Sequence, residues 1–112
     1  YNSELAGLAL QTPYQRIDSY SSYHLYPILL KQGEIKQTQC KLYDALKLAG
    51  ININIHYIPV YRQPYYQKMG YKEGYCPEAE QYHKEAISIP MFSAMSETQQ
   101  NYIVESIKTL VV

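Results

Sequence analysis

Residues 34–57 read EIKQTQCKLYDALKLAGININIHY, and this stretch decides the fold. In its first part, apolar residues recur at the three-to-four spacing of one helix face, at Ile35, Leu42, Tyr43, Leu46 and Ala49. This spacing predicts a helix over residues 34–49. Gly50 supplies the stop, because glycine readily adopts the left-handed conformation that ends helices.

The second part of the stretch, ININIHY, alternates isoleucine with asparagine over residues 51–57. Successive side chains of a strand point to opposite faces. We therefore expect a strand here, with its isoleucines in the core. Asn52 and Asn54 are expected on a solvent-exposed face.

The flanking sequence supplies the remaining elements. The run YHLYPILL at 23–30 predicts a strand, and Pro27 places it at an edge or a bulge because proline has no amide N–H. Pro64 and Pro77 suit the first turns of short helices over 64–69 and 78–84. Residues 86–89 predict a strand, and Ser96 followed by Gln99 resembles the capping box of a final helix. Its buried face would carry Ile103, Ile107 and Leu110.

These elements predict an α/β (α+β) fold, a two-layer sandwich with a small three-stranded sheet and helices on one face. The other face would carry His24, Tyr26, Asn52 and Asn54, which favours a neighbouring domain that covers it. Residues 1–10 are expected to end a helix and residues 11–22 to form a connecting loop. Because the sequence begins with Tyr1, we expect a fragment of a longer protein.

Composition excludes several classes of function. Lysine plus arginine equals aspartate plus glutamate at ten each, so no basic field exists to bind nucleic acid. Apolar runs are only a few residues long, so no membrane span is expected. Cys40 and Cys76 stand far apart, which argues against a zinc cluster or a disulfide framework and favours the cytoplasm.

The candidate binding residues lie in the run IHYIPVYRQPYY at 55–66. His56 can exchange a proton or hold a hydroxyl or phosphate, but it could equally be a strand-end histidine satisfied by a backbone carbonyl. Arg62 can pair with phosphate or carboxylate, or be a solvated surface residue. Tyr57 and Tyr61, with the tyrosines that follow, suit either a stacking wall for a ring-shaped ligand or a packing contact with another domain.

No reaction centre is visible within the chain. Neither cysteine has a histidine at motif spacing, and no glycine-rich loop opens a helix. His83 and Glu85 lack the spacing of metal ligands. The chain is therefore either part of a larger enzyme that supplies catalytic and cofactor residues elsewhere, or a free-standing tyrosine-rich binding module.

Three segments carry a resemblance to a known family: SSYHLYPILL, AGININIHYIPVYRQPYYQKMGY and CPEAEQYHKEAISIPMFSAMSETQQNYIVESI. In this order they resemble the C-terminal domain of DegT/DnrJ/StrS-type sugar aminotransferases. The resemblance implies a small domain at residues 23–112, preceded by a large domain that binds pyridoxal 5′-phosphate and lies outside this chain. It also implies a homodimer of the full-length enzyme.

The activity implied is transfer of an amino group from glutamate to the 4-keto position of a nucleotide-linked 6-deoxy sugar, a UDP-sugar of the pseudaminic acid type pathway. His56 matches the histidine that opens the family's HY-x-P segment, where it is expected to hold sugar or phosphate. Many members have a second histidine where this chain has Tyr61. Tyr57, Tyr61 and Arg62 complete the expected substrate-binding set, with no catalytic, cofactor or metal ligand in this chain.

Overall fold

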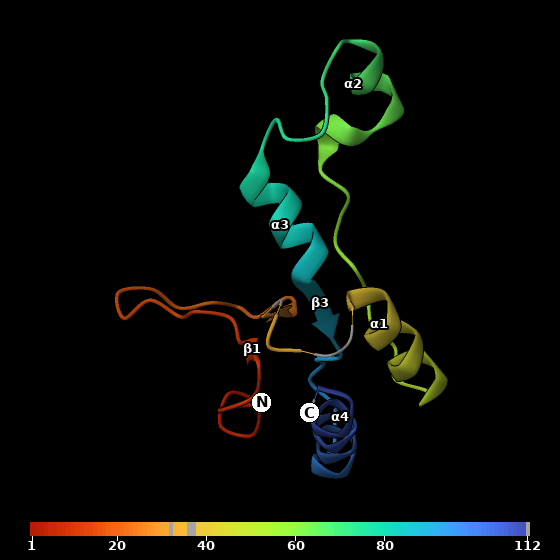
Figure 1. The fold of residues 1–112 in the computed structure, drawn as a ribbon. Helices are drawn as coiled ribbons and strands as arrows, with labels where there is room; N and C mark the ends of the chain where they lie inside the picture. The colour runs from red at the N-terminus through yellow and green to blue at the C-terminus, as the bar shows by residue number, and fades with distance from the viewer. Residues whose placement is uncertain (32, 36–37, 112) are drawn as a thin grey trace.

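The computed structural model describes residues 1–31, 33–35 and 38–111 (Figure 1). Within these residues the elements are, in chain order, β1 (Leu10–Gln11), β2 (Tyr26–Leu30), α1 (Gln39–Leu48), the 3-10 helix η1 (Val60–Arg62), α2 (Pro64–Lys68), α3 (Pro77–Glu85), β3 (Ala86–Ile89) and α4 (Glu97–Val111). The strands form an antiparallel sheet in the order β1, β2, β3. This architecture confirms the predicted α/β (α+β) fold.

One face of the sheet forms the core. Residues paired across an antiparallel ladder lie on the same face, so the pairs Ile28 with Ile87 and Tyr26 with Ile89 point together. They share a buried cluster with side chains of α1 and α4, which form the second layer. The members with no exposed surface are Ile28, Leu42, Leu46, Ile53, Ile87 and Ile107.

Helix α1 begins later than the sequence predicts. It starts at Gln39 rather than at residue 34, and residues 36–37 lie outside the described part of the chain. Thr38 caps the helix, because its side-chain oxygen accepts a hydrogen bond from the N–H of Lys41 at 3.4 Å. The local cap therefore overrides the longer apolar spacing.

The end of α1 confirms the predicted glycine stop. Gly50 has a φ of 75°, and its N–H donates to the carbonyl of Lys47 at 3.0 Å. The N–H of Ile51 reaches back to the carbonyl of Leu46, also at 3.0 Å. These two bonds make a Schellman motif, in which the buried side chains of Ile51 and Leu46 supply the usual apolar contact.

The strand predicted at 51–57 is wrong in its extent, but the predicted assignment of its side chains to a buried and an exposed face is confirmed. Ile51 and Ile53 are buried while Asn52 and Asn54 are exposed. The backbone joins the sheet only at one bridge, in which Asn54 and Ser88 exchange N–H to carbonyl bonds of 3.1 and 2.8 Å. The sheet's third strand is instead the two-residue β1.

Ala86 and Pro90, two residues before and two residues after Ser88, explain why the ladder has no further bridge. In antiparallel register, residue 56 would pair with Ala86, whose N–H already donates to Tyr82 and whose carbonyl accepts from the Gln39 side chain at 2.7 Å. Residue 52 would pair with Pro90, which has no N–H to give. The single bridge is therefore all that the edge of β3 can offer.

Pro27 lies in the central strand, so its predicted place at a sheet edge is wrong. Both backbone groups of the opposing Ser88 bond to Asn54, which makes Pro27 and Ser88 a non-hydrogen-bonded pair. The proline nitrogen therefore points away from β3. On that side β1 has already ended opposite Leu29, so no donor is needed at residue 27.

The predicted helix at residues 1–10 is also wrong. This segment forms turns, with one helix-like bond from the Leu5 N–H to the Tyr1 carbonyl at 2.9 Å, and Gly7 has a φ of 81° that a helix cannot contain. Leu5 and Leu10 are buried in the core. The side chain of Tyr26 is also buried in the core, and its hydroxyl donates a hydrogen bond to Asn2 Oδ1. Its predicted place on the opposite face of the sheet, with His24, Asn52 and Asn54, is therefore wrong.

Downstream, the local predictions are confirmed. Helices α2 and α3 each begin at their proline. At the start of α4, the N–H of Ser96 donates to Gln99 Oε1 at 2.9 Å and the N–H of Gln99 donates to Ser96 Oγ at 3.2 Å, which is a capping box. Ile103 and Ile107 are buried on α4, whereas Leu110 is only half-buried. No helix in the described ranges has both the length and the apolar content to cross a bilayer.

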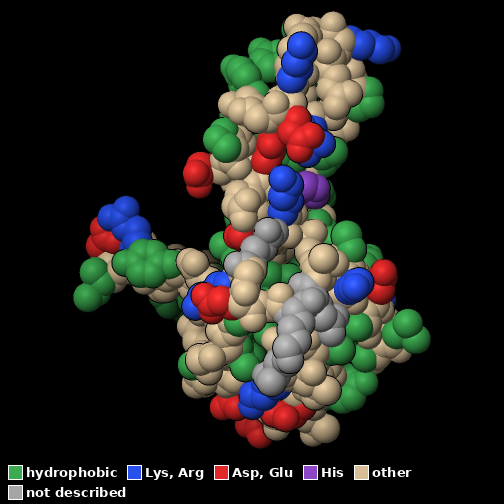
Figure 2. Space-filling view, viewed as in Figure 1, with side chains coloured by type: hydrophobic (Ala, Val, Ile, Leu, Met, Phe, Trp, Pro, Cys, Tyr) green, Lys and Arg blue, Asp and Glu red, His purple; other side chains and the backbone are tan. Residues whose placement is uncertain are grey.

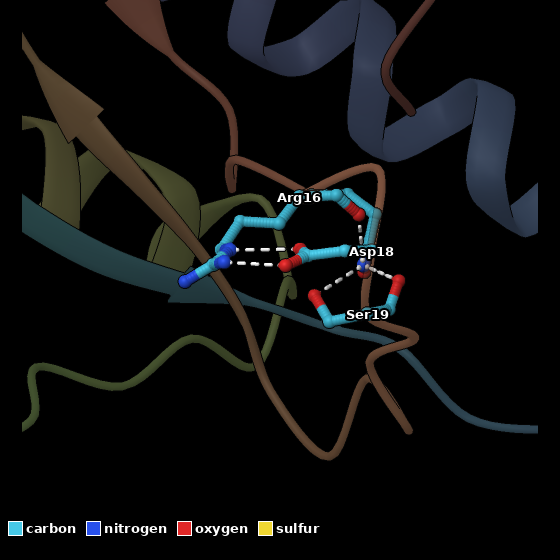
Figure 3. A network of polar contacts seen from close by, with 4 residues as sticks. Arg16, Asp18 and Ser19 are labelled. Carbon is cyan, nitrogen blue, oxygen red and sulfur yellow. Dashed lines mark hydrogen bonds and ion pairs between the residues drawn. The ribbon is translucent and has the colours of Figure 1, made fainter.

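Two excursions leave the body of the domain (Figure 1). The radius of gyration is 15.6 Å, against about 13 Å for a compact chain of this length. The N-terminal arm, residues 12–25, exposes hydrophobic side chains at its outer end (Figure 2), including those of Tyr14, Ile17 and Tyr20. It is braced internally by an Arg16–Asp18 ion pair and by the Gln15 side chain, which donates to Ser19 (Figure 3). The second, the central excursion of residues 55–85, carries η1, α2 and α3.

Candidate functional site

The most distinctive polar contact joins the central excursion to the sheet. His56 Nδ1 and Ser88 Oγ lie 3.0 Å apart and share a hydrogen bond whose direction depends on the histidine tautomer. Ser88 is only 8% exposed, whereas His56 is half-buried. No described residue bonds the other ring nitrogen, Nε2. The contact thus fixes one nitrogen and leaves the second free for a ligand.

We call the residues around this contact the polar face, comprising His24, Asn52, Asn54, His56 and Ser88. It lies opposite the core face, because Ser88 alternates with the core residues Ile87 and Ile89 along β3. A cavity of about 280 Å³ opens on this face. Its polar lining comes from His24, Asn52, Asn54 and Ser88.

Tyr57 adjoins His56 on the exposed side. Their ring centroids are 4.6 Å apart with an interplanar angle of 66°, an edge-to-face arrangement. Tyr57 is 75% exposed, so its ring is accessible to a partner. The structure therefore brings the first two predicted residues together, joined by a non-proline cis peptide bond.

Tyr61 instead belongs to a cluster inside the central excursion. Its hydroxyl donates to the Glu80 carboxylate and contacts the Cys76 carbonyl at 3.3 Å. Glu80 is 6% exposed and also accepts from the Gly74 N–H at 2.7 Å. Burial and the neighbouring carboxylate raise the pKa of Tyr61. The hydrogen bonds from Tyr61 and Gly74 lower the pKa of Glu80.

Arg62 is similarly engaged. Its guanidinium lies 3.4 Å from Glu73, and its side chain is 26% exposed. The predicted set of four thus divides into two pairs: His56 and Tyr57 on the polar face, and Tyr61 and Arg62 in contacts that hold residues 73–80. The second pair is positioned to shape the excursion.

The tyrosines of the excursion pack mainly against one another. Tyr61 contacts Tyr75 at 5.5 Å between ring centroids, Tyr75 contacts Tyr71 at 5.0 Å, and Tyr71 contacts Tyr66 at 6.2 Å. These contacts lie within the excursion itself, so they test neither the stacking wall nor the packing contact with another domain. Tyr65, at the end of the series, remains 69% exposed.

Sequence reasoning missed Ser88 and Glu80. A signal existed for Ser88, since it is the one polar residue of β3 and alternates with two isoleucines, as Asn54 does. For Glu80 no signal existed. A glutamate in a polar helix is ordinarily solvated, and only the return of the chain past Gly74 buries it.

The described residues do not build a site for pyridoxal phosphate, which needs a lysine and an acid convergent in one pocket. Six of the described lysines are exposed, and the seventh, Lys108, is half-buried beside Glu4 and Glu105. Among the same residues, no group of three His, Cys, Asp or Glu could hold a metal ion. The described groups of the polar face offer hydrogen-bond donors and acceptors to a ligand.

Comparisons with known proteins match this chain to part of longer proteins. The spore coat polysaccharide biosynthesis protein SpsC of Bacillus subtilis is 34% identical over 91% of this chain, which spans 27% of that protein. The UDP-4-amino-4,6-dideoxy-N-acetyl-beta-L-altrosamine transaminase of Campylobacter jejuni is 32% identical over 78% of the chain, which matches 23% of its length. The chain therefore spans about a quarter of the curated relatives that it resembles.

A solved structure gives the same result in three dimensions. The pyridoxal-phosphate form of a putative sugar aminotransferase, Spr1654 from Streptococcus pneumoniae, superposes with a TM-score of 0.86. The match covers 97% of this chain and 28% of that one, at 25% sequence identity. The model of the DegT/DnrJ/EryC1/StrS aminotransferase family matches residues 1–108. Because the family model and these relatives cover nearly the whole length, the chain belongs to the DegT/DnrJ/EryC1/StrS aminotransferase family.

Proposed function

We propose that this chain is the C-terminal, substrate-side domain of a pyridoxal-phosphate-dependent sugar aminotransferase. The full-length enzyme would transfer an amino group from glutamate to the 4-keto carbon of a UDP-linked 6-deoxy sugar, in a pathway of the pseudaminic acid type. The preceding large domain would hold the cofactor. The full-length enzyme is a cytoplasmic homodimer in this proposal.

The observation that carries the proposal is the His56–Ser88 contact on the polar face of a family member whose described residues build no cofactor site. Ser88 holds the imidazole at Nδ1, so Nε2 is available to bind a sugar hydroxyl or a phosphate oxygen. Tyr57 adds an exposed ring beside it. In this proposal His56 and Tyr57 contact substrate, while Tyr61 and Arg62 position the excursion that carries them.

The test uses the full-length parent protein with added pyridoxal phosphate, glutamate and UDP-4-keto-6-deoxy sugars. We expect bound cofactor, visible by its absorbance, and formation of the 4-amino sugar. A parent that neither binds the cofactor nor transfers the amino group would refute the proposal. Activity with a different sugar only would refute the assigned substrate but not the reaction.

The variant His56→Gln tests the proposed substrate contact of His56 in the same assay. His56→Gln should raise the KM for the nucleotide sugar more than it lowers kcat, because it removes a binding contact. Tyr82→Phe is the matched control, since Tyr82 is a partly exposed residue of α3 away from the polar face. Equal effects of the two substitutions would contradict a substrate contact at His56.

The alternative is a free-standing binding module, and the exposed rings of Tyr57 and Tyr65 are the observation that favours it. The coding sequence upstream of Tyr1 separates the two functions. A start codon immediately before Tyr1 supports the module. A preceding α/β region with a lysine-bearing motif supports the transferase.

A further inference from the structure

We infer that a second cavity, beside the start of α4, is a docking site for an extended, proline-containing segment of another polypeptide. We call it the aromatic cavity, and the lining residues that define it are Asn52, Pro90, Phe92, Gln99 and Tyr102. The inference goes beyond the proposed function and does not depend on it, because the ligand is a peptide and not the sugar.

Two aromatic rings line the aromatic cavity and remain open to solvent. Phe92 is 52% exposed and Tyr102 is 54% exposed. The Tyr102 hydroxyl donates to the carbonyl of Ala49 at 2.9 Å, which ties α4 to the end of α1 and holds the ring in place before a ligand arrives. Aromatic-lined grooves are a recurring means of binding proline-containing segments. The two rings therefore favour a ligand that offers an apolar ring of its own.

The two side-chain amides of the aromatic cavity offer donors rather than acceptors. The oxygen of Asn52 accepts from Lys47 Nζ at 2.9 Å, so the free part of this amide is its NH₂ group. Gln99 is held in the same sense, because its Oε1 accepts from the Ser96 N–H at 2.9 Å in the capping box. Neither NH₂ group has an acceptor among the described residues. The cavity is therefore matched to a ligand that brings acceptors.

Proline is the residue that fits these groups. It has no backbone N–H, while the carbonyls of a prolyl segment accept hydrogen bonds like any others. Such a segment gives its carbonyls to the two NH₂ groups and brings no N–H at the proline that the side chains of the cavity would leave unpaired. It is also extended before it binds, in the polyproline II conformation, so little conformational entropy is lost on docking.

The size of the aromatic cavity limits how much of the segment enters. Its volume of about 240 Å³ lies below the range of roughly 300–1,000 Å³ that small-molecule sites occupy. One prolyl residue suits this space, and the rest of the segment would lie along the surface. A carboxylate also accepts from NH₂ groups, and Lys47 bonds Asn52 although it does not line the cavity. The test therefore includes an anion.

The test is an NMR titration of the 112-residue chain with N-acetyl-prolyl-proline methyl ester, which has carbonyls but no N–H. The side-chain NH₂ signals of Asn52 and Gln99 should shift saturably, with a dissociation constant on the order of 1 mM for so small a ligand. N-acetyl-alanyl-alanine methyl ester has the same carbonyls and adds N–H donors. It should bind about fivefold more weakly, because those donors lose water without gaining a side-chain acceptor.

Matched variants test the donor and the ring separately. Asn52→Asp keeps an oxygen for Lys47 but replaces the NH₂ donor by a second acceptor, so it should weaken binding of the prolyl ester about tenfold. Asn54→Asp makes the same change of charge at a residue outside the lining and should bind like the parent. Phe92→Ala should weaken binding about fivefold through the lost ring contact. Tyr65→Ala, which removes an exposed ring from α2, is its control.

Several results would overturn the inference. They are the absence of saturable shifts with the prolyl ester, equal affinity for the prolyl and alanyl esters, and equal weakening within either pair of variants. Sodium propionate is the anionic probe, and shifts as large as those with the prolyl ester would make the cavity an anion site instead. A thermal unfolding curve for every variant shows that it is folded.

Discussion

Replacing Gly50 by alanine tests how the chain is directed from α1 to the polar face. Gly50 has a φ of 75°, and a Cβ built on it meets nothing within 4 Å. The cost of Gly50→Ala is therefore conformational and not steric. The left-handed backbone costs an L-residue about 1–2 kcal/mol, and the reduced entropy of the unfolded chain returns about 0.4–1 kcal/mol.

With the central values of these ranges, about 1.5 and about 0.7 kcal/mol, the net loss is about 0.8 kcal/mol in the free energy of unfolding. For 112 residues the unfolding entropy is about 0.24 kcal/mol/K, so the Tm should fall by about 3 °C. Urea unfolding followed by circular dichroism measures the free energy, and a calorimetric scan measures the Tm.

Two controls isolate the backbone term. Gly50→Asn should lose less stability than Gly50→Ala, because asparagine tolerates the left-handed region. D-alanine, introduced at residue 50 by peptide ligation, should stabilise the chain, since it favours positive φ and also restricts the unfolded state. The reasoning is refuted if Gly50→Ala is as stable as the parent, or if the D-alanine variant is as unstable as the L-alanine one.

Two other perturbations address the local contacts. Glu80→Gln should weaken the dependence of the free energy of unfolding on pH in acid. The pKa of Glu80 in the folded state is lowered from 4.5, so the carboxylate's stabilising contribution is present above pH 4.5 and is lost as the pH falls through the folded-state pKa. Urea unfolding at stepped pH measures this, and Glu78→Gln, an exposed neighbour in α3, should leave the acid dependence unchanged. Ser96→Ala should cost about 1 kcal/mol by removing the capping box of α4. Ser22→Ala is its exposed control, and equal unfolding free energies for the two variants would contradict the cap.

The features that could be predicted from sequence are those decided within a few residues. The Gly50 stop and the Ser96 capping box depend on a backbone conformation and a side chain acting over three or four positions. The helix starts at Pro64 and Pro77 belong to the same group. Such signals are present in the local sequence, whatever the rest of the chain does.

The features that could not be predicted depend on pairing across long separations. Leu10 and Gln11 are a strand only because Leu30 and Leu29 lie opposite them. The alternation at 51–57 gave the correct faces, but the number of backbone bonds depends on Ala86, whose own groups are taken by Tyr82 and Gln39. Long-range partners of this kind leave no periodic trace in the segment itself.

The candidate site shows the same limit. His56 and Tyr57 could be proposed from their types and from the loop that follows them, and the structure places them together. The contacts of Tyr61 could not be anticipated, because Glu80 reaches it from 19 residues away along the chain. A hydroxyl that looks free in the sequence is thus already bonded in the fold.

The single bridge between Asn54 and Ser88 bears on how this domain can change in evolution. Because the two residues exchange both backbone bonds, the chain leaves and re-enters the body at one point. The intervening segment behaves as a closed loop, and each doubling of a flexible loop's length costs only about 0.6 kcal/mol in closure entropy. Insertions and deletions within the central excursion, residues 55–85, can therefore change its length while the sheet and its two covering helices stay unaltered.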